Sequence, residues 1–174
     1  MYEDDKALKL TQWNQTKTKY AQKAIGDEAA ISARRNEIKH NGGRELCFQK
    51  AIYWADLGEN IGHEQNKVRP VLVVSKNIYN RSGNIVIVPL TTAPIRNHAH
   101  LLNCWYILYK QKYPRLEKTS IVKTEAIRSI SIERLTNNKY VCPSQVDILD
   151  LSPICYVNNI DWKKIQAKIK FLIN

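Results

Sequence analysis

The chain has 174 residues and a formal net charge of +11 at pH 7. This is the length of one domain with an extension, and the charge favours a polyanionic partner such as nucleic acid. Four cysteines with no CxxC pair predict reduced thiols in a cytosolic protein and argue against a zinc site; no cofactor is expected. The acidic start after Met1 is unlike a signal peptide, and no apolar stretch approaches the roughly 18 residues of a membrane span.

Residues 1–43 are expected to form a helical extension that ends at adjacent glycines. The segment is polar and contains no proline, and its apolar residues form only a thin stripe at helical spacing. We therefore expect the extension to be attached weakly to the rest of the chain and to be dispensable for activity. Its large apolar residues, Trp13 and Tyr20, are the expected anchors to a second subunit or to another protein.

From residue 44 onward the pattern changes to short apolar runs that are typical of strands. A turn composition over residues 80–84 predicts a hairpin between the second and the third run. Several short strands with polar turns indicate a small antiparallel barrel over residues 44–174. The candidate strands are residues 51–55, 71–75, 85–90, 101–109, 121–124 and 154–157.

The end of the chain predicts a helix that packs on the barrel. Asp161 can cap this helix, and apolar residues follow at helical spacing among lysines. The apolar positions are Trp162, Ile165, Ile169 and Leu172.

The positive charge is concentrated in the expected barrel. Residues 1–46 carry a net charge of +2, whereas residues 47–174 carry +9, so the polyanion site belongs to the barrel. Residues 105–115 interleave aromatic side chains with cations, which suits stacking of unpaired bases above a phosphate track. Half-buried aromatic side chains of a strand explain this stretch equally well.

Arg69 is the residue best placed for phosphate chemistry. It lies between a polar loop segment and the apolar run 71–74, and Pro70 restricts it to extended geometry. Arginine stays protonated, and its planar fork of donors fits phosphate oxygens. From this position alone, a phosphate contact and a pairing with a carboxylate both remain open.

Other candidates follow the ends of the expected strands. Thr91 and Thr92 offer hydroxyls to a phosphoryl oxygen, although a threonine pair is also common in strands and turns. Lys123 and Glu125 alternate with their neighbours and should project from one face, either beside a substrate or as a surface ion pair. His63 can act as an acid or a base, or can simply be exposed.

Residues 51–135 resemble the MazF/PemK/Kid family of toxin ribonucleases, a match over about half of the chain. The segment G-H-E-Q-x-x-x-R-P, which ends at Pro70, is the most specific part of the resemblance. The matching segments, in the order of the family, are residues 52–58, 61–65, 68–75, 80–81, 88–92, 127–130 and 134–135.

The resemblance implies a mainly β protein with helices, an SH3-like barrel that forms a homodimer. It implies cleavage of single-stranded RNA, usually mRNA, at short motifs without a metal, and neutralisation by a cognate antitoxin. Arg69 and Thr92 match the catalytic pair, with Thr91 as the alternative threonine, and Glu125 matches an acidic residue near the site. The residues that the resemblance implies as RNA contacts are His63, Glu64, Gln65, Lys67, Thr91, Lys123 and Arg128.

The implied reaction is attack of the RNA 2′-OH on the adjacent phosphorus, which leaves a cyclic phosphate and a 5′-hydroxyl. Arg69 and Thr92 suit charge stabilisation, and either Glu125 or His63 could be the base. Two other classes fit the same barrel: a non-catalytic toxin of the gyrase-poisoning type and a regulatory RNA-binding module. The joint presence of Arg69 and Thr92 favours the ribonuclease.

Overall fold

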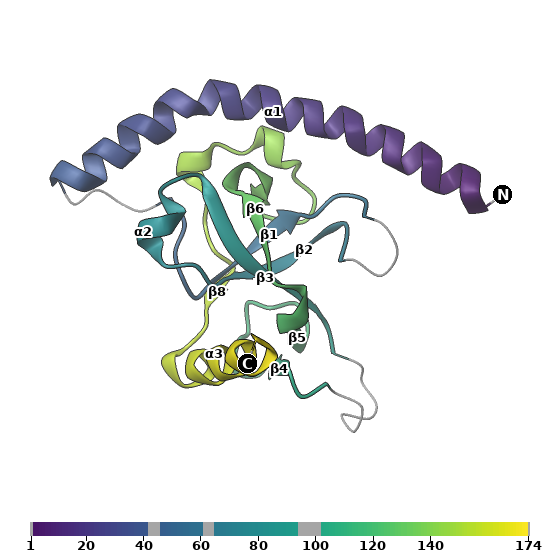
Figure 1. Ribbon diagram of the computed structural model, residues 1–174, viewed down its shortest axis with the longest axis vertical. Helices are drawn as coiled ribbons and strands as arrows, with labels where there is room; N and C mark the ends of the chain where they lie inside the picture. Colours follow the sequence, from purple (N-terminus) through teal and green to yellow (C-terminus); the bar gives the residue numbers. More distant parts are fainter. Residues whose placement is uncertain (1, 42–45, 61–64, 94–101, 174) are drawn as a thin grey trace.

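The computed structural model describes residues 2–41, 46–60, 65–93 and 102–173. A long helix, α1 (Tyr2–Asn41), lies along one side of a sheet domain, and a shorter helix, α3 (Asn159–Ile173), lies on the opposite side (Figure 1). The protein is therefore of mixed α/β class, with an N-terminal helix, an antiparallel sheet and a C-terminal helix. A one-turn helix, α2 (Asn77–Asn80), joins two of the strands.

The sheet follows the path β4-β5-β3-β2-β1-β7, with β6 paired to β3 and β8 paired to β1. Every one of these strand pairings is antiparallel. The strands are β1 (Ala51–Asp56), β2 (Val68–Val73), β3 (Asn84–Thr92), β4 (Trp105–Leu108), β5 (Ser120–Lys123), β6 (Arg128–Ser131), β7 (Leu135–Thr136) and β8 (Cys155–Tyr156). Short 3-10 helices connect the later strands: η2 (Thr124–Ala126), η3 (Ile132–Arg134), η4 (Pro143–Gln145) and η5 (Ile148–Asp150).

Five of the six expected runs became strands close to their expected positions, and β2 and β3 pair as the turn composition predicted. The run 101–109 gave a strand only at residues 105–108 of the described part, and β6 and β7 were not expected. The connection between β2 and β3 contains α2 rather than a simple turn. β2 begins three residues earlier than the run 71–75, at Val68, because Pro70 can pair opposite Trp54 in the β1–β2 ladder. This extension places Arg69 inside β2, opposite Ala55.

Alternation along the strands divides the core into two clusters of buried side chains. Tyr53, Ile85 and Leu135 belong to the cluster that packs with η4 and η5. Leu72 and Leu90 belong to the other cluster, on the side of α3. Trp162 and Ile165 of α3 are buried in this second cluster, as their helical spacing predicted, while Ile169 is partly buried against it. The sheet is thus covered on both faces.

Helix α1 is attached to the sheet domain by its two large aromatic residues. Trp13 and Tyr20 are only 7% and 6% exposed, and their rings meet edge to face with centroids 5.9 Å apart. The expectation that these residues anchor the extension to another protein is wrong, since they are buried against their own chain. The apolar stripe of α1 is thin, as expected, but Trp13 and Tyr20 are each buried against the sheet domain.

The predicted cap of the C-terminal helix is also wrong. The side chain of Asn158 caps α3, accepting a hydrogen bond from the Asp161 backbone N–H at 2.9 Å. The Asp161 carboxylate is buried and instead accepts hydrogen bonds from Tyr106, Tyr113 and Lys112. Burial alone would raise the pKa of this carboxyl, but the three donors outweigh burial and hold the pKa at about 2.

All four cysteines are free thiols. Within the described ranges, no helix combines the length and the apolar character of a membrane span.

Candidate functional site

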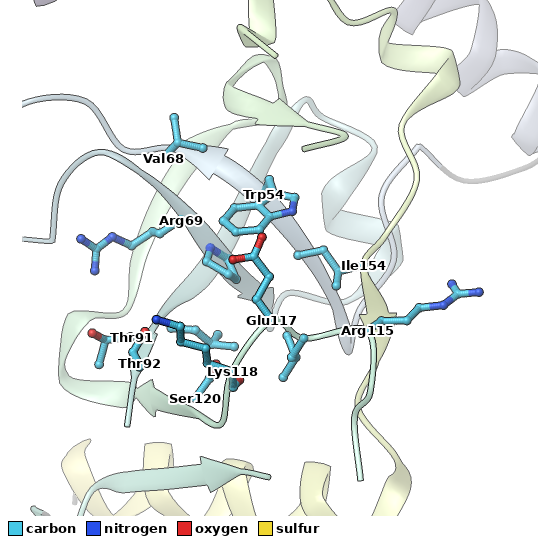
Figure 2. Close-up of a pocket in the computed structure, with 13 residues that line it drawn as sticks. Trp54, Val68, Arg69, Thr91, Thr92, Arg115, Glu117, Lys118, Ser120 and Ile154 are labelled. Carbon is cyan, nitrogen blue, oxygen red and sulfur yellow. The ribbon is translucent and has the colours of Figure 1, made fainter. Parts of the chain in front are cut away.

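A pocket of about 280 Å³ opens where β1, β2 and β3 meet the segment that precedes β5. Figure 2 shows Arg69, Thr91 and Thr92 on one side of this pocket and Arg115 on the opposite side. The lining residues are Trp54, Val68, Arg69, Pro70, Leu90, Thr91, Thr92, Arg115, Leu116, Glu117, Lys118, Ser120 and Ile154.

Arg69 is held by two neutral acceptors from the segment just before β2. Its Nε donates to the carbonyl oxygen of Asn66 at 2.7 Å, and its Nη1 donates to Oε1 of Gln65. Burial lowers the pKa of the guanidinium, but arginine begins so high that it stays protonated at neutral pH. In the described part of the chain Arg69 forms no ion pair, and Figure 2 shows its guanidinium at the edge of the pocket, directed away from Trp54 and Glu117.

The two threonines reach the pocket from the end of β3. The β2–β3 ladder ends at the pair Val71–Pro89, so Arg69 and Thr91 each lie two residues beyond its last pair. On the other edge of β3, Thr91 pairs with Ile121 and Thr92 pairs with Ser120 of β5. Both threonines line the pocket, with Thr91 half-buried and Thr92 exposed. A bound anion therefore meets hydroxyls and a guanidinium from neighbouring strands.

Three charged residues of the pocket come from the segment before β5. Arg115 was expected only as part of an aromatic and basic stretch, and Glu117 and Lys118 were not expected. The Glu117 carboxylate is ion-paired with Lys139 at 2.7 Å. Counted by residue, the lining carries three cations and one carboxylate, a net charge of +2, and Figure 2 shows the Arg69 and Arg115 guanidinium groups directed outward on opposite sides. The run of charges directly before an apolar strand was the signal that could have identified these residues.

Glu125 and Lys123 are not brought to this pocket. Oε2 of Glu125, in η2, accepts a hydrogen bond from Trp105 Nε1 at 2.7 Å, and its Oε1 lies 3.2 Å from Lys123 Nζ. The surface ion pair left open by the sequence is thus present, and neither residue lines the Arg69 pocket. Arg128 also lies outside the lining, where its Nη2 donates to the Leu57 carbonyl at 3.4 Å.

The remaining expected RNA contacts precede β2. His63 and Glu64 lie outside the described residues. Gln65 contacts Arg69 directly, as described above. Lys67 is exposed, has a φ of 63°, and borders a second pocket of about 270 Å³ between this segment and α1.

The described residues include no group of three or more His, Cys, Asp or Glu side chains arranged to hold a metal ion. What the Arg69 pocket offers is positive charge, three hydroxyls, one carboxylate and the indole of Trp54. These groups can bind a phosphodiester, stabilise negative charge on its non-bridging oxygens and accept a proton.

Comparisons with known proteins agree with this reading of the chain. The curated relatives include Endoribonuclease EndoA of Bacillus subtilis (strain 168), which is 38% identical over 86 residues, or 49% of this chain and 72% of that protein. Among solved structures, MazF (Form-I) from Deinococcus radiodurans aligns with a TM-score of 0.53 at 19% identity, over 73% of this chain and 96% of that one.

A MazE–MazF structure (Form-III) from the same organism aligns with a TM-score of 0.50 at 14% identity, over 74% of this chain and 96% of that chain. At these identities the structural matches show the fold. The family model described as PemK-like, MazF-like toxin of type II toxin-antitoxin system matches residues 48–172. The resemblance expected from the sequence is thereby confirmed over a longer stretch, and the chain belongs to the PemK-like, MazF-like toxin family of type II toxin-antitoxin systems.

Proposed function

We propose that this MazF-family toxin endoribonuclease cleaves single-stranded RNA, mainly mRNA, in the Arg69 pocket and without a metal ion. The observation that carries the proposal is the pairing of Arg69, which has no carboxylate partner among the described residues, with threonine hydroxyls in a pocket of net positive charge. This combination suits a phosphodiester whose charge grows during the reaction.

The RNA supplies its own nucleophile. The 2′-oxygen attacks the adjacent phosphorus, the bond from phosphorus to the 5′-oxygen breaks, and the products are a cyclic phosphate and a 5′-hydroxyl. The proton leaves the 2′-OH for a base, and the 5′-oxygen receives a proton as it departs. Arg69 donates to the non-bridging oxygens, and Thr92, the more exposed of the two threonines, adds a hydroxyl donor.

The base requires a carboxylate or an imidazole within reach of the 2′-OH. Glu125 was one candidate, but it lies outside the pocket lining, and His63, the other candidate, lies outside the described residues. We propose Glu117 in its place, because its side chain lines the same pocket as Arg69 and Thr92. Gln65 acts beside these residues by orienting Arg69.

The finer features of the fold and the assembly also belong to the proposal. We propose that the sheet of residues 44–174 closes into an SH3-like barrel, with residues 1–43 as an N-terminal extension packed against it, and that two copies form a dimer. A cognate antitoxin is the expected protein partner, and the related MazF of Deinococcus radiodurans was solved together with MazE. Action on mRNA places the toxin in the cytoplasm.

A single-stranded RNA carrying a fluorophore and a quencher, incubated with the full chain in EDTA, tests the proposal. We expect fluorescence to rise with the wild-type chain and to stay flat with Arg69→Ala. Binding of the RNA without cleavage would instead indicate a regulatory RNA-binding module. If the chain neither binds nor cleaves the RNA, the result would indicate a toxin of the gyrase-poisoning type.

A further inference from the structure

Helix α1 contacts residues 56–60, at the end of β1, although the helix lies outside the 48–172 match to the family. The Trp13 ring packs on Gly58, which has a φ of +77°, and a Cβ at this glycine would come within 2.1 Å of Trp13 Cζ2. The Arg134 guanidinium lies 5.3 Å from the same ring. The indole is therefore clamped between the end of β1 and η3.

Two polar contacts of α1 reach the same stretch of chain. The Tyr20 hydroxyl donates to Oδ2 of Asp56 at 2.6 Å, and Oδ1 of Asp56 accepts from the Gly58 backbone N–H at 2.8 Å. One turn from the start of α1, Lys6 Nζ lies 3.0 Å from Oε2 of Glu59 and donates to the Asn60 carbonyl at 2.9 Å. In Figure 1 the N-terminal half of α1 passes over the side where β1 connects to β2.

The stretch that α1 holds is bonded in turn to the residues before β2. The Lys67 backbone N–H donates to the Gly58 carbonyl at 2.7 Å, and the Leu57 N–H donates to the Lys67 carbonyl at 3.1 Å. Asn60 Nδ2 donates to the Gln65 carbonyl at 2.6 Å. Gln65 and its neighbour Asn66 then accept the hydrogen bonds of Arg69, so a continuous series of contacts runs from α1 to the guanidinium.

We propose that α1 is a brace for the site: Lys6, Trp13 and Tyr20 are positioning residues that fix the 56–60 and 65–67 stretches and, through Gln65, the orientation of Arg69. The proposal rests on the proposed function for its link to RNA cleavage. It reverses the expectation that the extension is dispensable. A displacement of about 1 Å at a reacting group can cost 10²-fold in rate, so a small loosening of these stretches should be visible in kcat.

The test uses the full chain with substitutions that each remove one functional group. Tyr20→Phe removes only the hydroxyl that donates a hydrogen bond to Asp56, and Lys6→Met removes the ammonium that contacts Glu59 and Asn60. Lys19→Met is the matched control, because Lys19 is an exposed lysine of the same helix. Two quantities are measured: kcat and KM for the fluorogenic RNA, and hydrogen exchange of the Leu57 and Lys67 amides, whose bonds join the two stretches.

We expect kcat to fall about tenfold in each variant and about 10²-fold in the double variant, with KM changed by less than about threefold. The Leu57 and Lys67 amides should exchange faster, and Lys19→Met should match the wild type. Trp13→Phe should retain more activity than Trp13→Ala, because a ring still covers Gly58. A double variant with wild-type kcat would overturn the proposal, as would a rise in KM alone. If the wild-type chain cleaves no RNA, the proposed function fails, and the role of α1 is then tested by hydrogen exchange alone. Faster exchange of the Leu57 and Lys67 amides in the variants supports the proposal, and unchanged exchange refutes it.

Discussion

Replacement of Arg69 by alanine should remove most of the catalysis and little of the stability. A guanidinium has five N–H donors, and in the described structure Gln65 and Asn66 take one each, which leaves three for phosphate oxygens. Loss of one preorganised donor costs about 2.7 to 4 kcal/mol, or 10² to 10³ in kcat. Since Arg69→Ala removes several donors and a full charge, we expect kcat to fall at least about 10³-fold.

The stability cost should be small by comparison. Hydrogen bonds that involve a charged group contribute about 1.5 to 3 kcal/mol each when buried, and the two bonds of Arg69 contribute less because its side chain is only half-buried. The assay is single-turnover cleavage of the fluorogenic RNA in EDTA, with the melting temperature of each variant as a control for folding. Arg69→Lys should recover only part of the rate, because an ammonium keeps the charge but not the planar fork. A folded Arg69→Ala chain with activity near that of the wild type would refute the assignment.

Thr92→Ala should lower kcat about 10²-fold through loss of one donor, and a larger effect of Thr91→Ala in the same assay would transfer the role to that residue. Glu117→Gln should lower kcat and make kcat less dependent on pH, whereas Glu125→Gln should change kcat little. If Glu125→Gln has the larger effect on the pH–rate profile, Glu125 is the base. The depressed pKa of Asp161, about 2 against an ordinary 3.8, stabilises the fold above pH 3.8, and this stability is lost as the pH falls toward 2. Asp161→Asn should therefore lower the free energy of unfolding by up to about 2 kcal/mol at neutral pH. In denaturant titrations, the stability of this variant should depend less on pH between pH 4 and 2 than that of the wild type. Unchanged stability at pH 7 would contradict this account.

The strands and the position of Arg69 could be predicted because they depend on local patterns. Apolar runs bounded by polar turns specify buried strands, and a proline after Arg69 favours extended backbone. The fit of Thr91 and Thr92 beside Arg69 followed from adjacent strands with a defined register. The strand patterns are encoded within a few residues of each other, whereas the meeting of Arg69 with Thr91 and Thr92 depends on strand pairing.

The attachment of α1 and the membership of the pocket depend on contacts that are distant in the sequence. Trp13 and Tyr20 formed only a sparse apolar pattern in the sequence of α1, because each is buried at its own site on the sheet domain and the helix has no continuous apolar face. Glu117 enters the pocket through the course of the chain between β4 and β5, which no periodicity specifies. The aspartate at position 161 looked like a cap by type, but three donors from other segments claim its carboxylate.

Analysis of the RNA ends produced by the full chain in EDTA tests the central claim most directly. The account predicts cleavage by the wild-type chain with a 2′,3′-cyclic phosphate on one product and a 5′-hydroxyl on the other, both identified by mass spectrometry, and no such products from Arg69→Ala. Cleavage that requires added magnesium, or products that carry a 5′-phosphate, would contradict attack by the 2′-OH in the Arg69 pocket.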